Sequence, residues 1–257
     1  MCGQHQSAAS ASGLTKAKDF ASTADPELVD DLVVANHILF DQGVVDAFGH
    51  VSVRHDKRPD RYLLARNLAP AEVTRDDIIE FDLDGSSADG DTRPVYLERF
   101  IHGEIYRVRP DVNSIVHSHS PTIVPFSVSS SVKLRPICHM SGFLGHGVPN
   151  FEIRDVAGDA TDLLIRSREL GAALAQSLGS ALIVLMRGHG STVVGESLKH
   201  AVYRAVYGEI NARLQAEAMR LGGPVTYLTS GEAASTFKNI ETQIKRPWDL
   251  WKKRAGK

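Results

Sequence analysis

Apolar residues recur every three to four positions in several stretches of the chain, which is the spacing of one buried face of a helix. From Pro26 onward, Leu28, Leu32 and Leu39 have this spacing, and Gly43 follows where a glycine commonly ends a helix. The hydrophobic pattern therefore predicts a first helix that begins near residue 26. The same spacing predicts further helices over 93–110, 167–179 and 196–223.

Shorter apolar segments lie between these helices and have the length of strands. The run ALIVLM at 181–186 is apolar throughout, which is typical of a buried strand. The segment at 77–83 ends at Asp84-Gly85, a common turn sequence. Because helices and strands alternate along the chain, the pattern predicts an α/β fold. The remaining predicted strands are HVSVR at 50–54, RYLLA at 61–65 and the start of SIVHSHSPT at 114–122.

One domain accounts for most of the 257 residues. The first two dozen residues are rich in Ala, Ser and Thr, so residues 1–25 are predicted to form a flexible N-terminal arm. No Pro-, Gly- or Ser-rich linker divides the rest of the chain. Residues 26–257 are therefore predicted to form a single domain, which is long enough to bury a full core.

The charge balance excludes several classes of partner. Lys and Arg total 29 against 31 for Asp and Glu, so no bulk positive charge draws the chain to nucleic acid or an anionic membrane. The longest apolar runs are too short to span a bilayer, and the first residues, MCGQHQSAASASG, lack the pattern of a signal peptide. Two cysteines, Cys2 and Cys138, favour a reducing compartment. We therefore expect a cytoplasmic protein whose partners are small molecules or copies of itself.

Two histidines stand two positions apart in the strand-like segment at 114–122. Side chains alternate between the faces of a strand, so His117 and His119 are expected to point the same way, with Ser118 opposite. Two imidazoles on one face can supply two nitrogen ligands to a metal. They can also be a hydrogen-bonded pair with no metal, so a third ligand is needed to decide between these hypotheses.

His189 and Glu98 are the further candidate ligands. His189 lies between two glycines in MRGHGST (186–192), directly after the buried strand, where the backbone can turn sharply. Three histidines would leave a fourth coordination position open, as in catalytic zinc sites. Glu98 lies among apolar residues of a predicted helix, and a carboxylate there suits a metal ligand or a general acid/base. Alternatively, His189 is only a turn residue and Glu98 an exposed partner of Arg99 or His102.

These motifs follow one another in a characteristic order: Glu98-Arg99, then IYRVRPDVNSIVHSHSP at 105–121, then RGHG at 187–190, then a long helix rich in Tyr and Ala. This order resembles the class II aldolase/adducin family, and the resemblance extends from about residue 27 to the end of the chain. It implies a three-layer α/β/α sandwich around a mainly antiparallel central sheet. It also implies a homo-oligomer, usually a tetramer, with the active site at a subunit boundary.

The resemblance implies roles for the four candidate residues. His117, His119 and His189 correspond to the ligands of a divalent metal ion, and Glu98 corresponds to a catalytic acid/base that can also touch the metal. Three histidines and a carboxylate accept Zn, Mn, Fe or Co, so the sequence does not select one metal.

Two segments depart from the pattern of the family's sugar-phosphate enzymes. The turn GHVS at 49–52 has His50 in place of an asparagine, and Ser52 ends this turn. The loop LLARNLAPAEVT at 63–74 lacks the glycine and paired hydroxyls of a phosphate cradle, and it offers Arg66, whose guanidinium matches a carboxylate. We therefore predict that Arg66, His50 and Ser52 bind a small-molecule carboxylate substrate.

His139, in RPICHMSGFLGHG at 135–147, lies in a segment that the family places near the metal. It is therefore a catalytic candidate alongside Glu98 and His50. Its alternative role is that of a loop histidine with a structural hydrogen bond.

Together these features resemble the branch of the family that contains decarboxylases of hydroxylated aromatic dicarboxylates, such as hydroxypyridine-dicarboxylate and dihydroxyphthalate, and so imply a role in aromatic catabolism. The implied activity is that of a metal-dependent carbon–carbon lyase, in which a chelated cation draws away the electrons left when carbon dioxide departs. Glu98 or a nearby histidine would then reprotonate the ring carbon. A sugar-phosphate aldolase or epimerase, a metal-dependent oxygenase and a noncatalytic adducin-like interaction module remain the alternatives.

Overall fold

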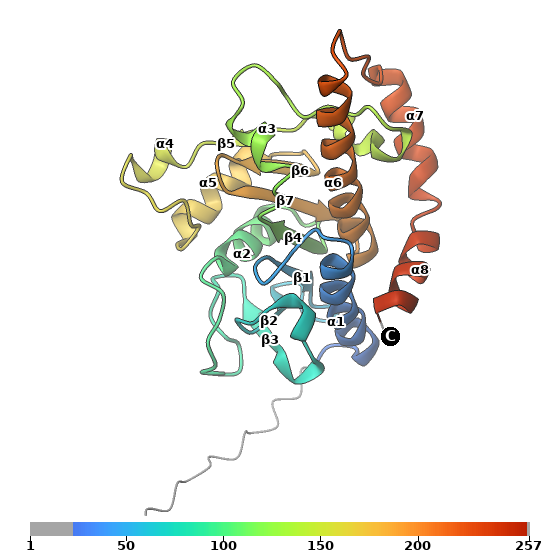
Figure 1. Cartoon of the computed structure of the whole chain (residues 1–257). Helices are drawn as coiled ribbons and strands as arrows, with labels where there is room; N and C mark the ends of the chain where they lie inside the picture. Colours follow the sequence, from blue (N-terminus) through green and yellow to red (C-terminus); the bar gives the residue numbers. More distant parts are fainter. Residues whose placement is uncertain (1–22, 256–257) are drawn as a thin grey trace, which may run out of the picture.

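The computed structural model describes residues 23–255, which form a central sheet with helices on both sides (Figure 1). The predicted arm over 1–25 lies almost entirely outside the described residues. Within 23–255, no helix is both long enough and apolar enough to cross a membrane.

In this part of the chain, seven strands make one sheet in the order β3-β2-β1-β4-β7-β6-β5. Neighbouring strands are antiparallel except for β5 and β6, which are parallel. The sheet is therefore mainly antiparallel, and the predicted α/β class is confirmed. The strands are β1 (His50–Arg54), β2 (Arg61–Ala65), β3 (Ile78–Asp82), β4 (Ser114–Ser118), β5 (Asn150–Phe151), β6 (Ile183–Met186) and β7 (Gly190–Gly195).

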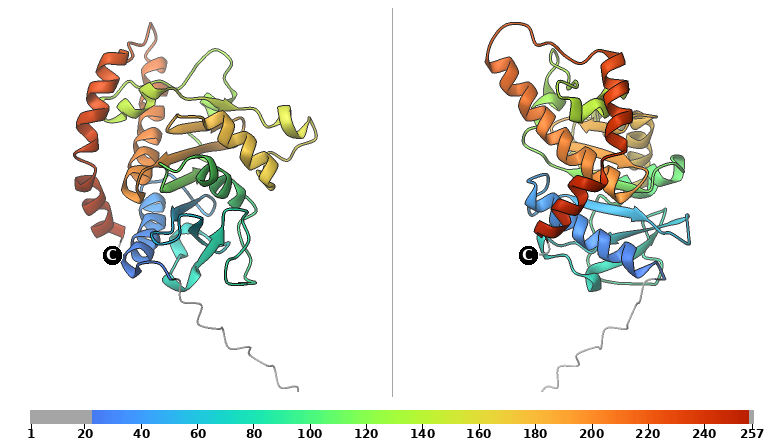
Figure 2. Two further views of the ribbon diagram at one scale, coloured as in Figure 1. Left: turned by 180° about the vertical axis from the view of Figure 1, so that it is seen from behind. Right: turned by 90° about the vertical axis from the view of Figure 1, so that its right-hand side faces the viewer.

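One face of the sheet is covered by the first helix and by the longest one. α1 (Pro26–Asp41) packs against β1, and α6 (Leu198–Arg220) packs against β4 and β7. α8 (Lys245–Ala255) lies against both of these helices, and α7 (Ser230–Glu241) lies against the short 3-10 helix η3 (His139–His146) (Figure 2). The C-terminal helices thus form the outer wall on this side.

The opposite face is covered by α2 (Arg99–Val108) and α5 (Arg168–Leu178), which pack against each other. The two helical layers with the sheet between them make the α/β/α sandwich that the family resemblance implied (Figure 1). The remaining short helices are η1 (Pro70–Glu72), η2 (Arg75–Asp77), α3 (Val124–Val128) and α4 (Arg154–Ala157).

Helix α2 is shorter than its hydrophobic pattern predicts. The pattern favours a helix over 93–110, but the observed helix begins at Arg99. The preceding residues are held against the loop after β2, where the hydroxyl of Tyr96 donates to the carbonyl oxygen of Leu68 at 2.6 Å. In the same region the backbone N–H of Asn67 donates to the carbonyl oxygen of Pro94 at 2.8 Å, which occupies the acceptor that a helix beginning at Pro94 would use, and Glu98 becomes the N-cap residue of α2.

Candidate metal centre

The register of the sheet places histidines from distant parts of the sequence side by side. His50 of β1 pairs with His117 of β4, and His117 pairs with Thr192 of β7. His119 follows the end of β4, and His189 lies in the turn between β6 and β7, next to that same end of β4. The three imidazoles of His117, His119 and His189 therefore lie where the end of β4 meets the turn between β6 and β7, in the middle of the sheet.

Two glycines allow the hairpin turn to hold His189. Gly188 has a φ of +66°, a left-handed conformation that favours glycine. At Gly190, an added Cβ atom would overlap the carbonyl oxygen of Ser118, so a side chain there would push β7 away from β4. Both glycines of the RGHG motif are thus explained by backbone geometry.

Four side chains converge at this point. Glu98, His117, His119 and His189 each offer one ligand atom, and these atoms lie within 4.8 Å of one another. Nε2 of His119 lies 3.1 Å from Nε2 of His117 and 3.0 Å from Nε2 of His189. Oε2 of Glu98 lies 3.4 Å from Nε2 of both His117 and His189, and 3.9 Å from that of His119. The structure brings the four predicted ligands together, and their metal-binding role remains a prediction.

Hydrogen bonds on the far side of two rings show where their protons lie. Nδ1 of His117 is 3.1 Å from the carbonyl oxygen of Ser191, and Nδ1 of His189 is 2.9 Å from that of Leu163. Because a carbonyl oxygen only accepts, both rings carry the proton on Nδ1 and present the Nε2 lone pair to the cluster. In tetrahedral zinc sites, nitrogen ligands about 2.0 Å from the ion lie about 3.3 Å from one another. The donor set and its spacing therefore fit a divalent cation.

The charge state of the cluster also suits a cation. Burial alone would raise the pKa of the Glu98 carboxyl, but His117 and the hydrogen bonds with all three histidines outweigh burial and lower that pKa. Burial lowers the pKa of His117 to about 4 against the opposing effect of Glu98. Burial would also lower the pKa of His189, but the hydrogen bond with Glu98 and the charge of Glu98 outweigh burial and raise this pKa. At neutral pH, Glu98 is therefore ionised and His117 is neutral.

One short segment, 163–165, supports the cluster from outside. The carbonyl oxygen of Leu163 accepts from His189, and the N–H of Ile165 donates to Oε1 of Glu98 at 2.9 Å. Leu163 has a φ of +70°, a left-handed conformation that is rare for a residue with a side chain. Such a conformation persists where the surrounding contacts determine it, so segment 163–165 is held in place by the side chains that it orients.

His50 lies directly beside the cluster. Its ring centroid is 5.0 Å from that of His117 and 4.6 Å from that of Tyr96. Nδ1 of His50 is 2.7 Å from Nε2 of His102. Burial, together with the neighbouring His102 and His117, holds the pKa of His50 well below its usual value, so the ring is neutral.

The other predicted site residues lie at different depths. The Arg66 side chain is 35% exposed, and its Nε donates to Oδ1 of Asp77 at 2.6 Å. Ser52 is fully buried, with its hydroxyl 2.6 Å from Nδ1 of His102. His139 is exposed at the start of η3 and contributes no atom to the cluster. The substrate-binding and catalytic roles of these residues remain predictions.

Sequence reasoning placed neither His102 nor Tyr106 in the site, but the structure connects both to it through Ser52. Both residues belong to α2 and are buried. Their signal is the spacing: Glu98, His102 and Tyr106 follow at four-residue intervals, which places them on one side of a helix.

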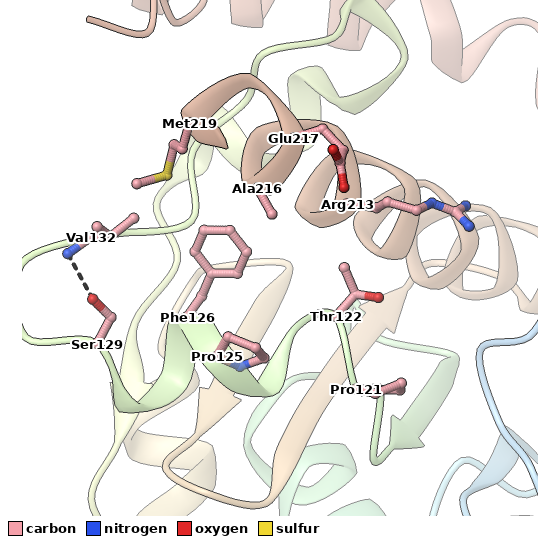
Figure 3. A pocket seen from close by; sticks show the side chains of 10 residues that line it. All are labelled: Pro121, Thr122, Pro125, Phe126, Ser129, Val132, Arg213, Ala216, Glu217 and Met219. Carbon is pink, nitrogen blue, oxygen red and sulfur yellow. Dashed lines mark hydrogen bonds between the residues drawn. The ribbon is translucent and has the colours of Figure 1, made fainter. Parts of the chain in front are cut away.

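A separate hollow of about 590 Å³ lies between α3 and the second half of α6. Figure 3 shows Phe126 of α3 facing Ala216 and Met219 of α6 across it. None of its lining residues is one of the four candidate ligands, so it is distinct from the candidate metal centre.

Comparison with known proteins identifies the family. Residues 30–216, well over half of the chain, match the class II aldolase and adducin N-terminal domain. The chain belongs to the class II aldolase and adducin family. The resemblance inferred from the order of the motifs is therefore confirmed.

Two relatives of this class II aldolase family member are named as decarboxylases. Decarboxylase tropJ of Talaromyces stipitatus is 40% identical over 237 residues, which cover 84% of this chain and 89% of the relative. A 3,4-dihydroxyphthalate decarboxylase of Arthrobacter keyseri is 30% identical over 218 residues, which cover 79% of this chain and 83% of the relative. These relatives support a lyase.

Solved structures share the fold of this class II aldolase family member. The L-fuculose 1-phosphate aldolase from Glaciozyma antarctica PI12 has a TM-score of 0.73 at 24% identity, over 89% of this chain and 88% of that chain. The expected class II aldolase-like architecture is therefore confirmed.

Proposed function

We propose that this protein is a metal-dependent carbon–carbon lyase that decarboxylates a hydroxylated aromatic carboxylate or dicarboxylate. The convergence of three imidazole Nε2 atoms beside an ionised Glu98 carries this proposal. Similarity to two decarboxylases supports the type of reaction.

His117, His119, His189 and Glu98 would hold the metal ion. Imidazole nitrogens with one carboxylate accept Zn, Mn, Fe or Co. When bound, the cation supplies a Lewis acid that draws electron density from a chelated hydroxyl and carboxylate.

Glu98 is the proposed proton carrier. Because the pKa of Glu98 is lowered, its resting form is the carboxylate, and the bond from Ile165 to Oε1 leaves Oε2 turned toward the cluster. Oε2 can take the proton of the substrate's ring hydroxyl and return it to the ring carbon when the carbon–carbon bond breaks. The products are carbon dioxide and the ring oxyanion, so atoms and charge balance.

Arg66 is proposed to bind a second carboxylate of the substrate. Its Nε bond to Asp77 fixes the plane of the guanidinium, and neither Nη atom has a hydrogen-bond partner within residues 23–255. A fixed guanidinium with two free Nη groups matches a carboxylate in a bidentate manner. Tyr96 links the two residues: its hydroxyl donates to the carbonyl oxygen of Leu68, two residues after Arg66, and its ring packs on His50.

The decisive experiment offers metal-loaded protein a panel of hydroxylated aromatic carboxylates and sugar phosphates, and measures released carbon dioxide and aldehyde. We expect at least one aromatic acid to release carbon dioxide. This activity should disappear when a chelator removes the metal and return when metal is added back. His189→Ala should abolish it. His37→Ala, a control histidine on α1 whose Nε2 contacts the carbonyl oxygen of Val73, should not.

Other outcomes of this panel would replace the proposal. Aldehyde released from a sugar phosphate, with no carbon dioxide, would identify an aldolase. Oxygen consumed with an aromatic substrate would identify an oxygenase. A chain that binds no metal and turns over nothing would be a noncatalytic interaction module.

We also propose a cytoplasmic homotetramer with the site at a subunit boundary. Phe48 supports the subunit boundary: the residue is 66% exposed, yet its ring lies 6.2 Å from that of His119. A large apolar ring in that position is suited to contact with a second subunit. The exposed His139 would then take part from a neighbouring subunit. Light scattering coupled to size-exclusion chromatography measures the oligomeric state.

A further inference from the structure

A continuous chain of buried hydrogen bonds runs from α2 to His50. The hydroxyl of Tyr106 lies 2.8 Å from Oγ of Ser52, and that Oγ lies 2.6 Å from Nδ1 of His102. Nε2 of His102 then lies 2.7 Å from Nδ1 of His50. All four residues are at most 4% exposed, so water does not substitute for any of these partners.

The first member of this chain fixes the direction of every later bond. Tyr106 has one hydroxyl proton, and Ser52 is the one hydrogen-bond partner of that hydroxyl within the described residues. Because a buried hydroxyl proton without an acceptor is costly, Tyr106 donates to Ser52. The Ser52 hydroxyl proton is then free to point at Nδ1 of His102.

The two histidines continue in the same direction. Nδ1 of His102 accepts from Ser52, so the proton of this neutral ring lies on Nε2 and is donated to Nδ1 of His50. His50 therefore carries its own proton on Nε2. The reverse direction would place a proton on Nδ1 of His50, and it would leave the Tyr106 hydroxyl proton buried without an acceptor.

We propose that Tyr106, Ser52 and His102 are positioning residues that hold His50 as the Nε2–H tautomer, so that His50 is a neutral hydrogen-bond donor to a substrate carboxylate. Nε2 of His50 has no hydrogen-bond partner within residues 23–255, and the ring packs on the ligand His117 and on Tyr96. The identity of the acceptor rests on the proposed function; the tautomer does not.

This assignment gives Ser52 and His50 different tasks. His50 touches the substrate, and Ser52 acts through His102. A donor held in one tautomer is ready for an anionic oxygen without first exchanging a proton with water. The locked tautomer also makes His50 a binding group and not a general base.

The tautomer can be observed directly in zinc-loaded protein labelled with ¹⁵N-histidine. Solid-state NMR distinguishes a protonated ring nitrogen from an unprotonated one, and a His50→Gln variant identifies the His50 signals. We expect His50 to be protonated on Nε2 and unprotonated on Nδ1. In Tyr106→Phe the directing proton is gone, so we expect a second signal from the Nδ1–H form.

Tyr62→Phe is the matched control. Tyr62 is another buried tyrosine, and its ring centroid lies 6.1 Å from that of His102. Its hydroxyl donates to the carbonyl oxygen of Arg99 and takes no part in the hydrogen bonds that lead from Tyr106 to His50. The His50 signals should be unchanged in Tyr62→Phe. A wild-type His50 protonated on Nδ1, or equal changes in both tyrosine variants, would overturn the assignment.

Binding of salicylate to the zinc-loaded protein tests the consequence. We expect Tyr106→Phe to weaken the affinity by roughly 3- to 10-fold, the effect of losing one neutral hydrogen bond, and Tyr62→Phe to leave it unchanged. Equal affinity in wild type and Tyr106→Phe would remove the donor role of His50. Absence of decarboxylation with an intact Nε2–H signal would instead refute the proposed function alone.

Discussion

The bond between Asp77 and Arg66 gives the sharpest prediction about substrate binding. Asp77 accepts from the backbone N–H and the hydroxyl of Thr74 through Oδ2, at 2.8 and 2.7 Å, and from Nε of Arg66 through Oδ1 at 2.6 Å. Asp77→Asn replaces one acceptor oxygen by an amide donor, so the side chain can no longer serve both partners. The guanidinium of Arg66 is then free to rotate.

The expected effect is a higher KM for a dicarboxylate with little change in kcat. A hydrogen bond to a charged group contributes roughly 1.5 to 3 kcal/mol, but the 35% exposure of the Arg66 side chain reduces this to about 1 kcal/mol through screening. That free energy corresponds to an increase in KM of about fivefold. Asp77→Asn also weakens one of the two bonds of the capping box between Thr74 and Asp77, which should lower the free energy of unfolding by up to about 1 kcal/mol.

Asp111→Asn is the matched control in the same steady-state assay. Asp111 forms a comparable pair with Arg109, at 2.8 and 2.7 Å, but it precedes the start of β4, and the candidate ligands lie at the other end of that strand. Its KM should stay at the wild-type value. A KM for Asp77→Asn within twofold of wild type, in protein shown to be folded by circular dichroism, would refute the role given to Arg66.

Three further results are expected. His119→Ala removes the ring that contacts both other imidazoles, so the affinity for metal, measured by titration against a competing chelator, should fall by more than the roughly 10- to 100-fold that loss of an outer partner costs. Glu241→Gln should lower the free energy of unfolding in urea at pH 7 by about 1 kcal/mol, because solvent screens the charges around this partly exposed carboxylate. Burial opposes this shift, but the hydrogen bond with His200 and the charge of Arg204 lower the pKa of Glu241 from 4.5 to about 2. The stabilisation from Glu241 is therefore complete above pH 4.5 and lost as the pH falls toward 2. A difference in unfolding free energy between wild type and variant that stays constant over this range would contradict the prediction. Gly190→Ala should lower the melting temperature by several degrees, because its Cβ would meet β4.

Five of the seven strands and the helices α1, α2, α5 and α6 could be predicted because their signals are local, whereas α3, α4, α7, α8 and the two-residue strand β5 were not predicted. The predicted segments 50–54 and 61–65 coincide with β1 and β2, and the predicted helix over 196–223 differs from α6 by two or three residues at each end. β7 was not predicted. Its sequence GSTVVG begins and ends with glycine, and it is a central strand because β4 and β6 pair with it on both sides, which no local pattern reveals.

The candidate site also has some features that local sequence predicts and others that depend on how distant elements pack. The period of two in HSH predicts that His117 and His119 share a face, and the glycines of RGHG predict a sharp turn that holds His189 over the sheet edge. The connection from Tyr106 to His50 crosses from a helix to a strand, so it depends on how α2 packs on the sheet. Likewise, the position of Glu98 before the helix depends on the bonds of Pro94 and Tyr96 to a distant loop, which sequence spacing does not contain.

Because segment 163–165 bonds to both Glu98 and His189, a single backbone amide can report on the site from outside it. The N–H of Ile165 points at a carboxylate oxygen, so its exchange with deuterium should slow or quicken as the charge next to it is shared with an ion. Occupancy could thus be followed in the unlabelled enzyme, during turnover, without a probe attached to any residue that performs the chemistry.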